Sequence, residues 1–86
     1  MRMRVEDCIT LTERAVGLPR GSMYLPTRTH EISHPRQAAM LLAREMGNSL
    51  SHIARVLSVD HTSVIHGIKA AESRRNEVLE QMKVEK

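Results

Sequence analysis

The sequence contains no Phe and no Trp, and Tyr24 is its single aromatic residue. Because β-sheets are enriched in aromatic and β-branched residues, this absence argues against a core built on a sheet. Leu, Ile, Val, Ala and six Met must supply most of the 41% of residues that are apolar, and such side chains favour packed helices. We therefore expect an all-α fold, a small helical bundle in one domain spanning 1–86, since so short a chain buries only one modest core.

Cysteine is almost absent as well. Cys8 stands alone, which excludes an internal disulfide and a metal site built from several cysteines. It falls on the apolar face of the first expected helix, so we do not expect it to act as a nucleophile. The apolar runs are too short to cross a bilayer, and the first residues lack the apolar core of a signal peptide. We expect a cytoplasmic, nucleoid-associated protein without a membrane partner.

Two further classes of function lack the residues they require. Among five histidines, His30 and His34 have a spacing that can bind metal on one helix face. Pro35 and the Thr-rich loop argue against one continuous helix there, and no cysteine or carboxylate completes a set. The sequence also has no Gly-x-x-x-x-Gly-Lys-Ser/Thr loop, so it cannot bind or hydrolyse ATP in that way. We expect no metal, no cofactor, no ATP and no enzymatic activity.

Positive charge gathers in the middle of the chain, within a net charge of +3. Residues 14–71 carry seven basic groups against three acidic ones, whereas the segment from 72 onward has four of each and is expected to be a solvated helix face. A basic central part indicates a polyanion as partner, although a basic surface alone does not prove one.

The order of helices can be predicted from apolar spacing and from helix-ending residues. We expect a helix over Val5–Val16 that Gly17 and Pro19 end. A basic loop at about 20–34 follows, with a short helical turn near Ser22–Leu25. The next helix is expected to have Pro35 in its first turn and to run to Met46, with Met40 and Met46 as core residues.

The segment 50–69, LSHIARVLSVDHTSVIHGIK, matches a helix-turn-helix, which we place at about 49–71. Such a pair of helices needs a large and then a small apolar residue at their contact, here Ile53 and Ala54. Leu57 closes the first helix and Val59 fills the corner, while Ser49 and Asp60 are suitable N-caps. The second helix is expected to extend to Leu79 or beyond, with Val64 and Ile68 packed inward. Its polar start can then face the major groove of double-stranded DNA.

These residues resemble a known family. His34-Pro35-Arg36-Gln37-Ala38-Ala39-Met40, followed by Leu50 and by Asp60-His61-Thr62-Ser63-Val64-Ile65-His66, is similar to the C-terminal DNA-binding domain of the bacterial replication initiator DnaA. The resemblance covers about Val5 to Arg75 and implies a helical fold of the Trp repressor and DnaA C-terminal type. It also implies sequence-specific binding to DNA sites of the DnaA-box type, in replication initiation or its regulation.

The resemblance implies a role for each matching residue. Base reading falls to Asp60, His61, Thr62 and Ser63, and entry into the minor groove falls to Arg28 in the basic loop. Phosphate contacts are expected from Arg36, Gln37, Ser51, Arg55, His66 and Lys69. No dimer seam is evident, so we expect a monomer.

The sequence also departs from the family pattern. Ser58-Val59 shortens the usual Gly-Gly-Arg, Ser51 replaces a proline, and the basic loop keeps one arginine where the family has two or three basic residues. The motor domain of the initiator is absent, which leaves a stand-alone protein, of the host or of a phage, or an excised domain. Two alternatives stay open beside replication: a transcriptional regulator, and a protein-interaction module that acts on replication factors.

Overall fold

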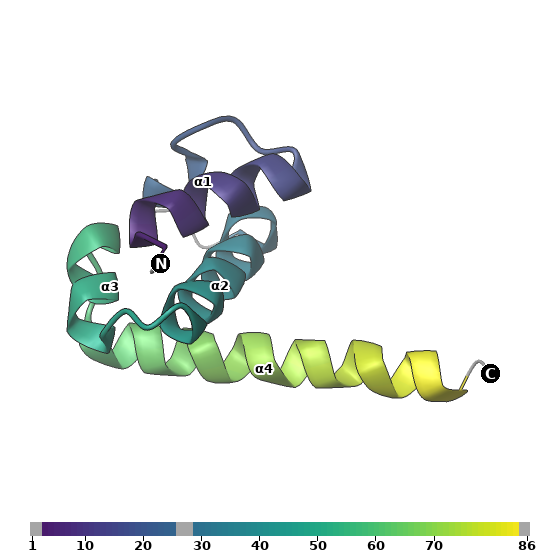
Figure 1. Cartoon of the computed structure of the whole chain (residues 1–86). Coiled ribbons are helices and arrows are strands. Elements are labelled where there is room, and N and C mark those ends of the chain that lie inside the picture. Colours follow the sequence, from purple (N-terminus) through teal and green to yellow (C-terminus); the bar gives the residue numbers. More distant parts are fainter. Residues whose placement is uncertain (1–2, 26–28, 85–86) are drawn as a thin grey trace.

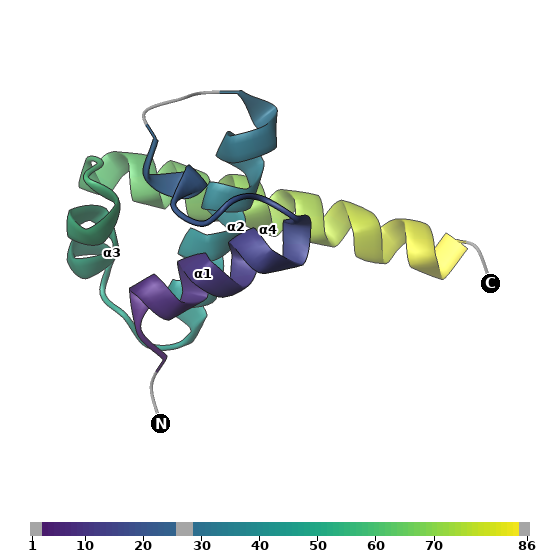
Figure 2. The ribbon, with the colours of Figure 1, turned by 90° about the horizontal axis from the view of Figure 1, so that it is seen from above.

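The computed structural model describes residues 3–25 and 29–84, with side chains as far as Glu80. All regular structure in these ranges is helical, which confirms the all-α expectation. The elements are α1 (Val5–Val16), the short 3-10 helix η1 (Ser22–Tyr24), α2 (His30–Glu45), α3 (Leu50–Leu57) and α4 (His61–Val84). In Figure 1, α2 lies between α1 and α4, and α3 stands beside the start of α4. The view from above in Figure 2 shows η1 over α2, just before the undescribed residues 26–28.

The core joins residues from every helix, as the apolar spacing predicted. Its buried members are Val5, Cys8, Ile9, Met23, Ala39, Met40, Ala43, Ile53, Ala54, Leu57 and Val64. Cys8 lies inside this cluster, and burial raises the pKa of its thiol, so it has the environment of a core residue rather than of a nucleophile. Met40 is a core residue as predicted. The prediction for Met46 was wrong, because it follows the end of α2 and is 38% exposed.

The start of α2 differs from the sequence prediction. The loop was expected to reach residue 34, with Pro35 in the first helical turn, but α2 already begins at His30. The carbonyl of Thr29 accepts hydrogen bonds from the amides of Ile32 and Ser33, at 3.1 and 2.7 Å, which builds an extra first turn. Pro35 therefore lies in the second turn. Pro35 has no amide hydrogen to donate to the carbonyl of Glu31, and the helix tolerates this loss near its N-terminus.

The corner between α3 and α4 is formed by the predicted residues. Ser49 caps α3, its hydroxyl accepting from the amide of His52 at 3.1 Å. Ser58 ends α3 in the left-handed conformation with φ of 57°, and Val59 donates its amide to the carbonyl of Ala54 at 3.0 Å. Val59 then packs, half-buried, against the core. These contacts turn the chain directly into α4.

A close approach fixes α4 against α2. Gly67 is buried in this contact, and a Cβ atom at that position would lie 2.5 Å from Sδ of Met40 and 3.3 Å from Cγ of Gln37. Val64 and Ala71 are buried on the same side of α4. The absence of a side chain at residue 67 therefore allows the two helices to approach closely, with this face of α4 turned inward.

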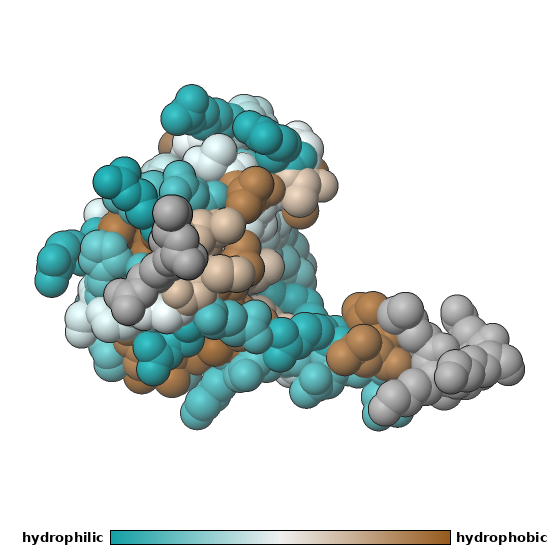
Figure 3. Space-filling view, in the orientation of Figure 1, coloured by the Kyte–Doolittle hydropathy of each residue, from teal (hydrophilic) through white to brown (hydrophobic). Residues whose placement is uncertain are grey.

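Beyond this contact, α4 projects from the rest of the molecule (Figure 1), which gives the structure its longest dimension of 41 Å. Val78 and Leu79 lie on the projecting part and are 55% and 49% exposed. Apolar atoms are visible in Figure 3 on this part of α4, next to the undescribed side chains. No helix in the described ranges is long and apolar enough to cross a membrane.

The Gly67 contact gives a first prediction. Gly67→Ala should destabilise the fold by about 1–2 kcal/mol, because overpacking against Met40 exceeds the gain of about 1 kcal/mol in helix propensity. The free energy of unfolding from urea titrations measures this change. In Met40→Ala, which removes the clashing sulfur, the same glycine substitution should cost at least about 1 kcal/mol less. Ser73→Ala, on the exposed face of α4, is the control, and equal costs in both backgrounds would contradict the packing argument.

Candidate nucleic-acid interface

The start of α4 presents a continuous polar surface. Asp60, His61, Thr62 and Ser63 are all exposed, whereas the next residue, Val64, is fully buried. The amide of Val64 donates to the carbonyl of Asp60 at 3.2 Å, which closes the first turn. The four residues predicted to read bases are thus brought together at one helix start, with their side chains accessible.

The exposed face continues along α4. Thr62, His66 and Lys69 are exposed and follow one another at intervals of four and three residues, so they share one helix face. Gly67 and Ala71 lie on the opposite, buried side, against α2. We call the exposed residues Asp60–Ser63, His66 and Lys69 the α4 stripe. It has hydrogen-bonding groups at its start and a cation two turns further on.

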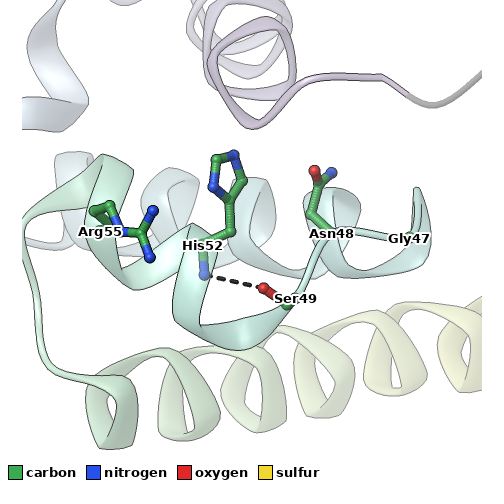
Figure 4. A pocket seen from close by; sticks show the side chains of 5 residues that line it. All are labelled: Gly47, Asn48, Ser49, His52 and Arg55. Atoms are coloured by element: carbon green, nitrogen blue, oxygen red, sulfur yellow. Dashed lines mark hydrogen bonds between the residues drawn. The ribbon is translucent and has the colours of Figure 1, made fainter.

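The predicted phosphate contacts on α3 are also accessible. Ser51 and Arg55 are exposed and lie one turn apart on α3, which packs directly against α4. An open groove of about 460 Å³ lies along the same helix, lined by Gly47, Asn48, Ser49, His52 and Arg55. In Figure 4 the side chains of Asn48 and His52 point away from α4, so the groove opens on a different side of α3 from the α4 stripe. Among the residues that line the groove, Arg55 alone is also one of the predicted phosphate contacts.

Arg36 and Gln37 are less accessible than these residues, because both are half-buried. The guanidinium of Arg36 donates from Nε to the carbonyl of Met23 at 3.0 Å and from Nη2 to the carbonyl of Leu25. Burial lowers the pKa of Arg36, although an arginine in a protein keeps its charge. Gln37 is half-buried beside Gly67, and its Oε1 has no hydrogen-bond partner among the described residues. Both side chains are half-buried, and their predicted phosphate contacts stay predictions.

Arg28, predicted to enter the minor groove, lies outside the described residues. The segment before it contains a feature that the sequence analysis missed. Glu13 of α1 is only 2% exposed and accepts hydrogen bonds from the amides of Gly21 and Met23. One signal was present in the sequence, because Glu13 continues the spacing of four from Val5 and Ile9 and so lies on the buried face of α1.

His30 and His34, the two histidines with metal-ligand spacing, lie on one continuous helix, α2. The expectation that Pro35 and the Thr-rich loop would prevent this was wrong. The rings of His30 and His34 stack with centroids 4.6 Å apart. Partial burial, the nearby charge of Arg74 and then that of His30 lower the pKa of His34. Arg74 also donates to the carbonyl of His34 at 3.4 Å. Among the described residues there is no group of three or more His, Cys, Asp or Glu that could hold a metal ion.

Two helices meeting at a tight corner, the second with an exposed polar start, define the helix-turn-helix class of protein. The family comparison identifies the member of that class. Residues 5–70 match the model described as "Bacterial dnaA protein helix-turn-helix", and the chain belongs to this family. The match is to a DNA-binding domain, which is not a catalytic domain, and no motor domain is covered.

Curated relatives agree with this assignment. The chain is 32% identical over 78 residues to "Chromosomal replication initiator protein DnaA" of Caulobacter vibrioides, an alignment that covers 88% of this chain and 16% of the relative. It is 33% identical over 73 residues to the protein of the same name from Rhodopseudomonas palustris, covering 83% and 16%. The chain thus spans about one sixth of the length of these relatives. No solved structure matched it.

His34 provides a prediction for the dependence of stability on pH. Its pKa is lowered in the folded state, so the unfolded chain takes up the proton first, at the ordinary value of about 6.5. The free energy of unfolding should therefore fall as the pH drops from 7.5 through 6.5 towards the lower pKa of the folded state. Well above pH 6.5 the His34 ring is neutral in both states, so its protonation lowers the stability of the fold no further there.

Urea titrations across this pH range test the effect in the wild type and in His34→Gln, where the fall should be smaller. Arg74→Gln removes one of the charges that disfavour the protonated ring, so it should reduce the fall only in part. An identical pH dependence in the wild type and in His34→Gln would show that the residue makes no such contribution.

Proposed function

We propose that this protein binds double-stranded DNA in a sequence-specific manner, with the start of α4 in the major groove. The observation that carries the proposal is the sharp change from the exposed residues Asp60–Ser63 to the fully buried Val64. Helix-turn-helix proteins read base edges with such an N-terminal part of the second helix. His61, Thr62 and Ser63 carry short hydrogen-bonding groups, Asp60 can accept from a cytosine amino group, and the Thr62 methyl suits a thymine methyl.

Phosphate contacts flank this reading helix in the proposal. Lys69 and His66 lie further along the α4 stripe, and Ser51 and Arg55 are exposed on α3, which packs beside it. Side chains of this kind fix register on the duplex and supply affinity without reading sequence. Arg28 of the basic loop completes the interface by entering the adjacent minor groove, where narrow A·T-rich segments attract arginine.

The proposed sites are of the DnaA-box type, because the family match covers the reading helix and the relatives bear the name of replication initiators. We propose a monomer that acts in replication initiation or its regulation, associated with the nucleoid through DNA. A single module of this size buries about 600–1,000 Å² on DNA, so its affinity should be moderate.

A second candidate, a protein-interaction module, is favoured by one observation. Val78 and Leu79 are exposed on the part of α4 that projects beyond the other helices (Figures 1 and 3). That surface lies away from the α4 stripe, so the two candidate functions require different residues. Binding to protein would not require the polar start of α4.

The reading residues give a prediction about specificity. After selection of the preferred site from random duplexes, His61→Ala and Thr62→Ala should each lower affinity for that site by about 1–3 kcal/mol. Affinity for random DNA should change little. Asn76→Ala is the matched control, an exposed polar residue of α4 that lies about 20 Å further along the helix. Equal losses on the selected and random duplexes would show that neither residue reads a base.

The cations give a prediction about salt dependence. Each neutralised phosphate releases about 0.9 counterion, so contacts by Lys69, Arg55 and Arg28 imply a log–log slope of affinity against salt of about −3. Fluorescence-anisotropy titrations at several salt concentrations measure this slope, and Lys69→Ala should reduce it by about one unit. Arg75→Ala should leave it unchanged, because Arg75 on α4 pairs instead with Glu45 at 2.9 Å. A flat salt response would overturn DNA binding and favour the protein-interaction module.

A further inference from the structure

Glu13 is a buried carboxylate that serves the backbone of another segment. Its Oε2 accepts hydrogen bonds from the amides of Gly21 and Met23, at 2.9 and 3.1 Å. These amides open η1, the short helix that follows the bend after α1. Burying a carboxylate is costly unless hydrogen bonds satisfy it, so the position of Glu13 is tied to the conformation of Gly21–Met23.

Arg36 holds the same segment from the side of α2. Its Nε donates to the carbonyl of Met23 at 3.0 Å, and its Nη2 donates to the carbonyl of Leu25. Glu13 therefore binds backbone donors of Gly21–Leu25, and Arg36 binds backbone acceptors of the same five residues. We call these four hydrogen bonds the η1 clamp.

The η1 clamp holds a part of the backbone that the burial of side chains alone would not hold. The side chain of Met23 is 1% exposed and already anchors η1 in the core, whereas Leu25 is 54% exposed and has no such anchor. The hydrogen bond from Arg36 reaches the carbonyl of Leu25, the last described residue before residues 26–28 of the basic loop. On the far side of the loop, Thr29 is fixed as the first backbone acceptor of α2. The direction in which the chain leaves Leu25 thus depends on Arg36, and through Met23 on Glu13.

We propose that Glu13 and Arg36 are positioning residues for DNA recognition, which hold Gly21–Leu25 so that the basic loop meets the minor groove beside the site read by α4. This inference rests on the proposed function. It adds a role to the phosphate contact predicted for Arg36, because the guanidinium donates to the backbone of its own chain. In this added role Arg36 acts on affinity through the loop.

The first variant is Arg36→Lys, which keeps the charge but cannot donate from two nitrogens to two carbonyls. Its matched control is Arg44→Lys on the same helix, because Arg44 also donates to a backbone carbonyl, that of Asn48 at 3.0 Å, far from η1. Two ratios are measured by anisotropy for each protein. The flank preference is the affinity for the selected site with A·T flanks divided by the affinity for the same site with G·C flanks. The Thr62 ratio is the affinity for the selected site divided by the affinity for a site altered at the base assigned to Thr62.

The wild type should prefer A·T flanks by about tenfold, the size of effect that one base pair typically has. Arg36→Lys should reduce this preference to within about twofold and leave the Thr62 ratio unchanged, whereas Arg44→Lys should change neither. Glu13→Gln, which keeps the shape and removes the charge, is the second variant and should weaken the flank preference in the same direction. Circular dichroism shows which variants are folded at the assay temperature, so that loss of structure is not read as loss of positioning.

Selective loss of the flank preference in either folded variant supports the inference, because a general loss of stability would lower the affinity for every duplex by the same factor and leave both ratios unchanged. An unchanged flank preference in both variants, or a parallel fall of both ratios, overturns it while leaving the proposed function intact. A wild type that binds the selected site without any flank preference overturns this inference together with the minor-groove part of the proposed function. A wild type without salt-dependent duplex binding overturns the proposed function itself.

Discussion

The close contact of α4 with α2 at Gly67 is the constraint on which the rest of the structure depends. Met40 and Gln37 lie close to the missing side chain, so α4 packs closely against α2 with its Gly67 face. That packing turns Val64 and Ala71 inward. Residues on the opposite face, Thr62, His66 and Lys69, must then face solvent, because a helix places positions three and four apart on one side. The accessibility of the proposed reading residues is thus a consequence of packing on the far side of the same helix.

A second constraint acts on the segment between α1 and α2. There the backbone is held by two charged side chains, Glu13 and Arg36, and by the apolar side chain of Met23. Charge-assisted hydrogen bonds have stricter geometry than apolar contacts, so they specify a direction as well as a location. The α4 stripe and the segment Gly21–Leu25 are therefore fixed by different means, the first by close packing and the second by hydrogen bonds from charged side chains. Both depend on α2, which carries Met40 and Arg36 a little more than one turn apart.

The helix-turn-helix could be predicted from the sequence because its determinants are local. Ile53, Ala54 and Leu57 lie on one face of α3, and all three are buried as their spacing indicated. The contacts of Arg36 with Met23 and Leu25 were missed because these partners lie 13 and 11 residues away, across a turn that no periodic pattern reports. Pro35 was taken as a sign of the helix start, whereas Thr29 supplies an earlier one through its carbonyl. Met46 was assigned to the core from composition alone, although its position after the end of α2 leaves it exposed.

The corner before α4 shows how the departures from the family pattern act together. Ser58 has the left-handed conformation that glycine adopts more easily, at a cost of about 1–2 kcal/mol for a residue with a Cβ atom. Val59 is half-buried against the core where the family pattern carries an arginine. The corner therefore gains an apolar contact, which offsets part of the strain, and lacks a cation beside the start of α4. Because Arg36 is also engaged with backbone carbonyls, the proposed interface has few cations to neutralise phosphates. In the proposed interface a larger share of the binding free energy would then come from the base contacts of Asp60–Ser63 than from phosphate contacts, which would make binding more dependent on sequence than on salt.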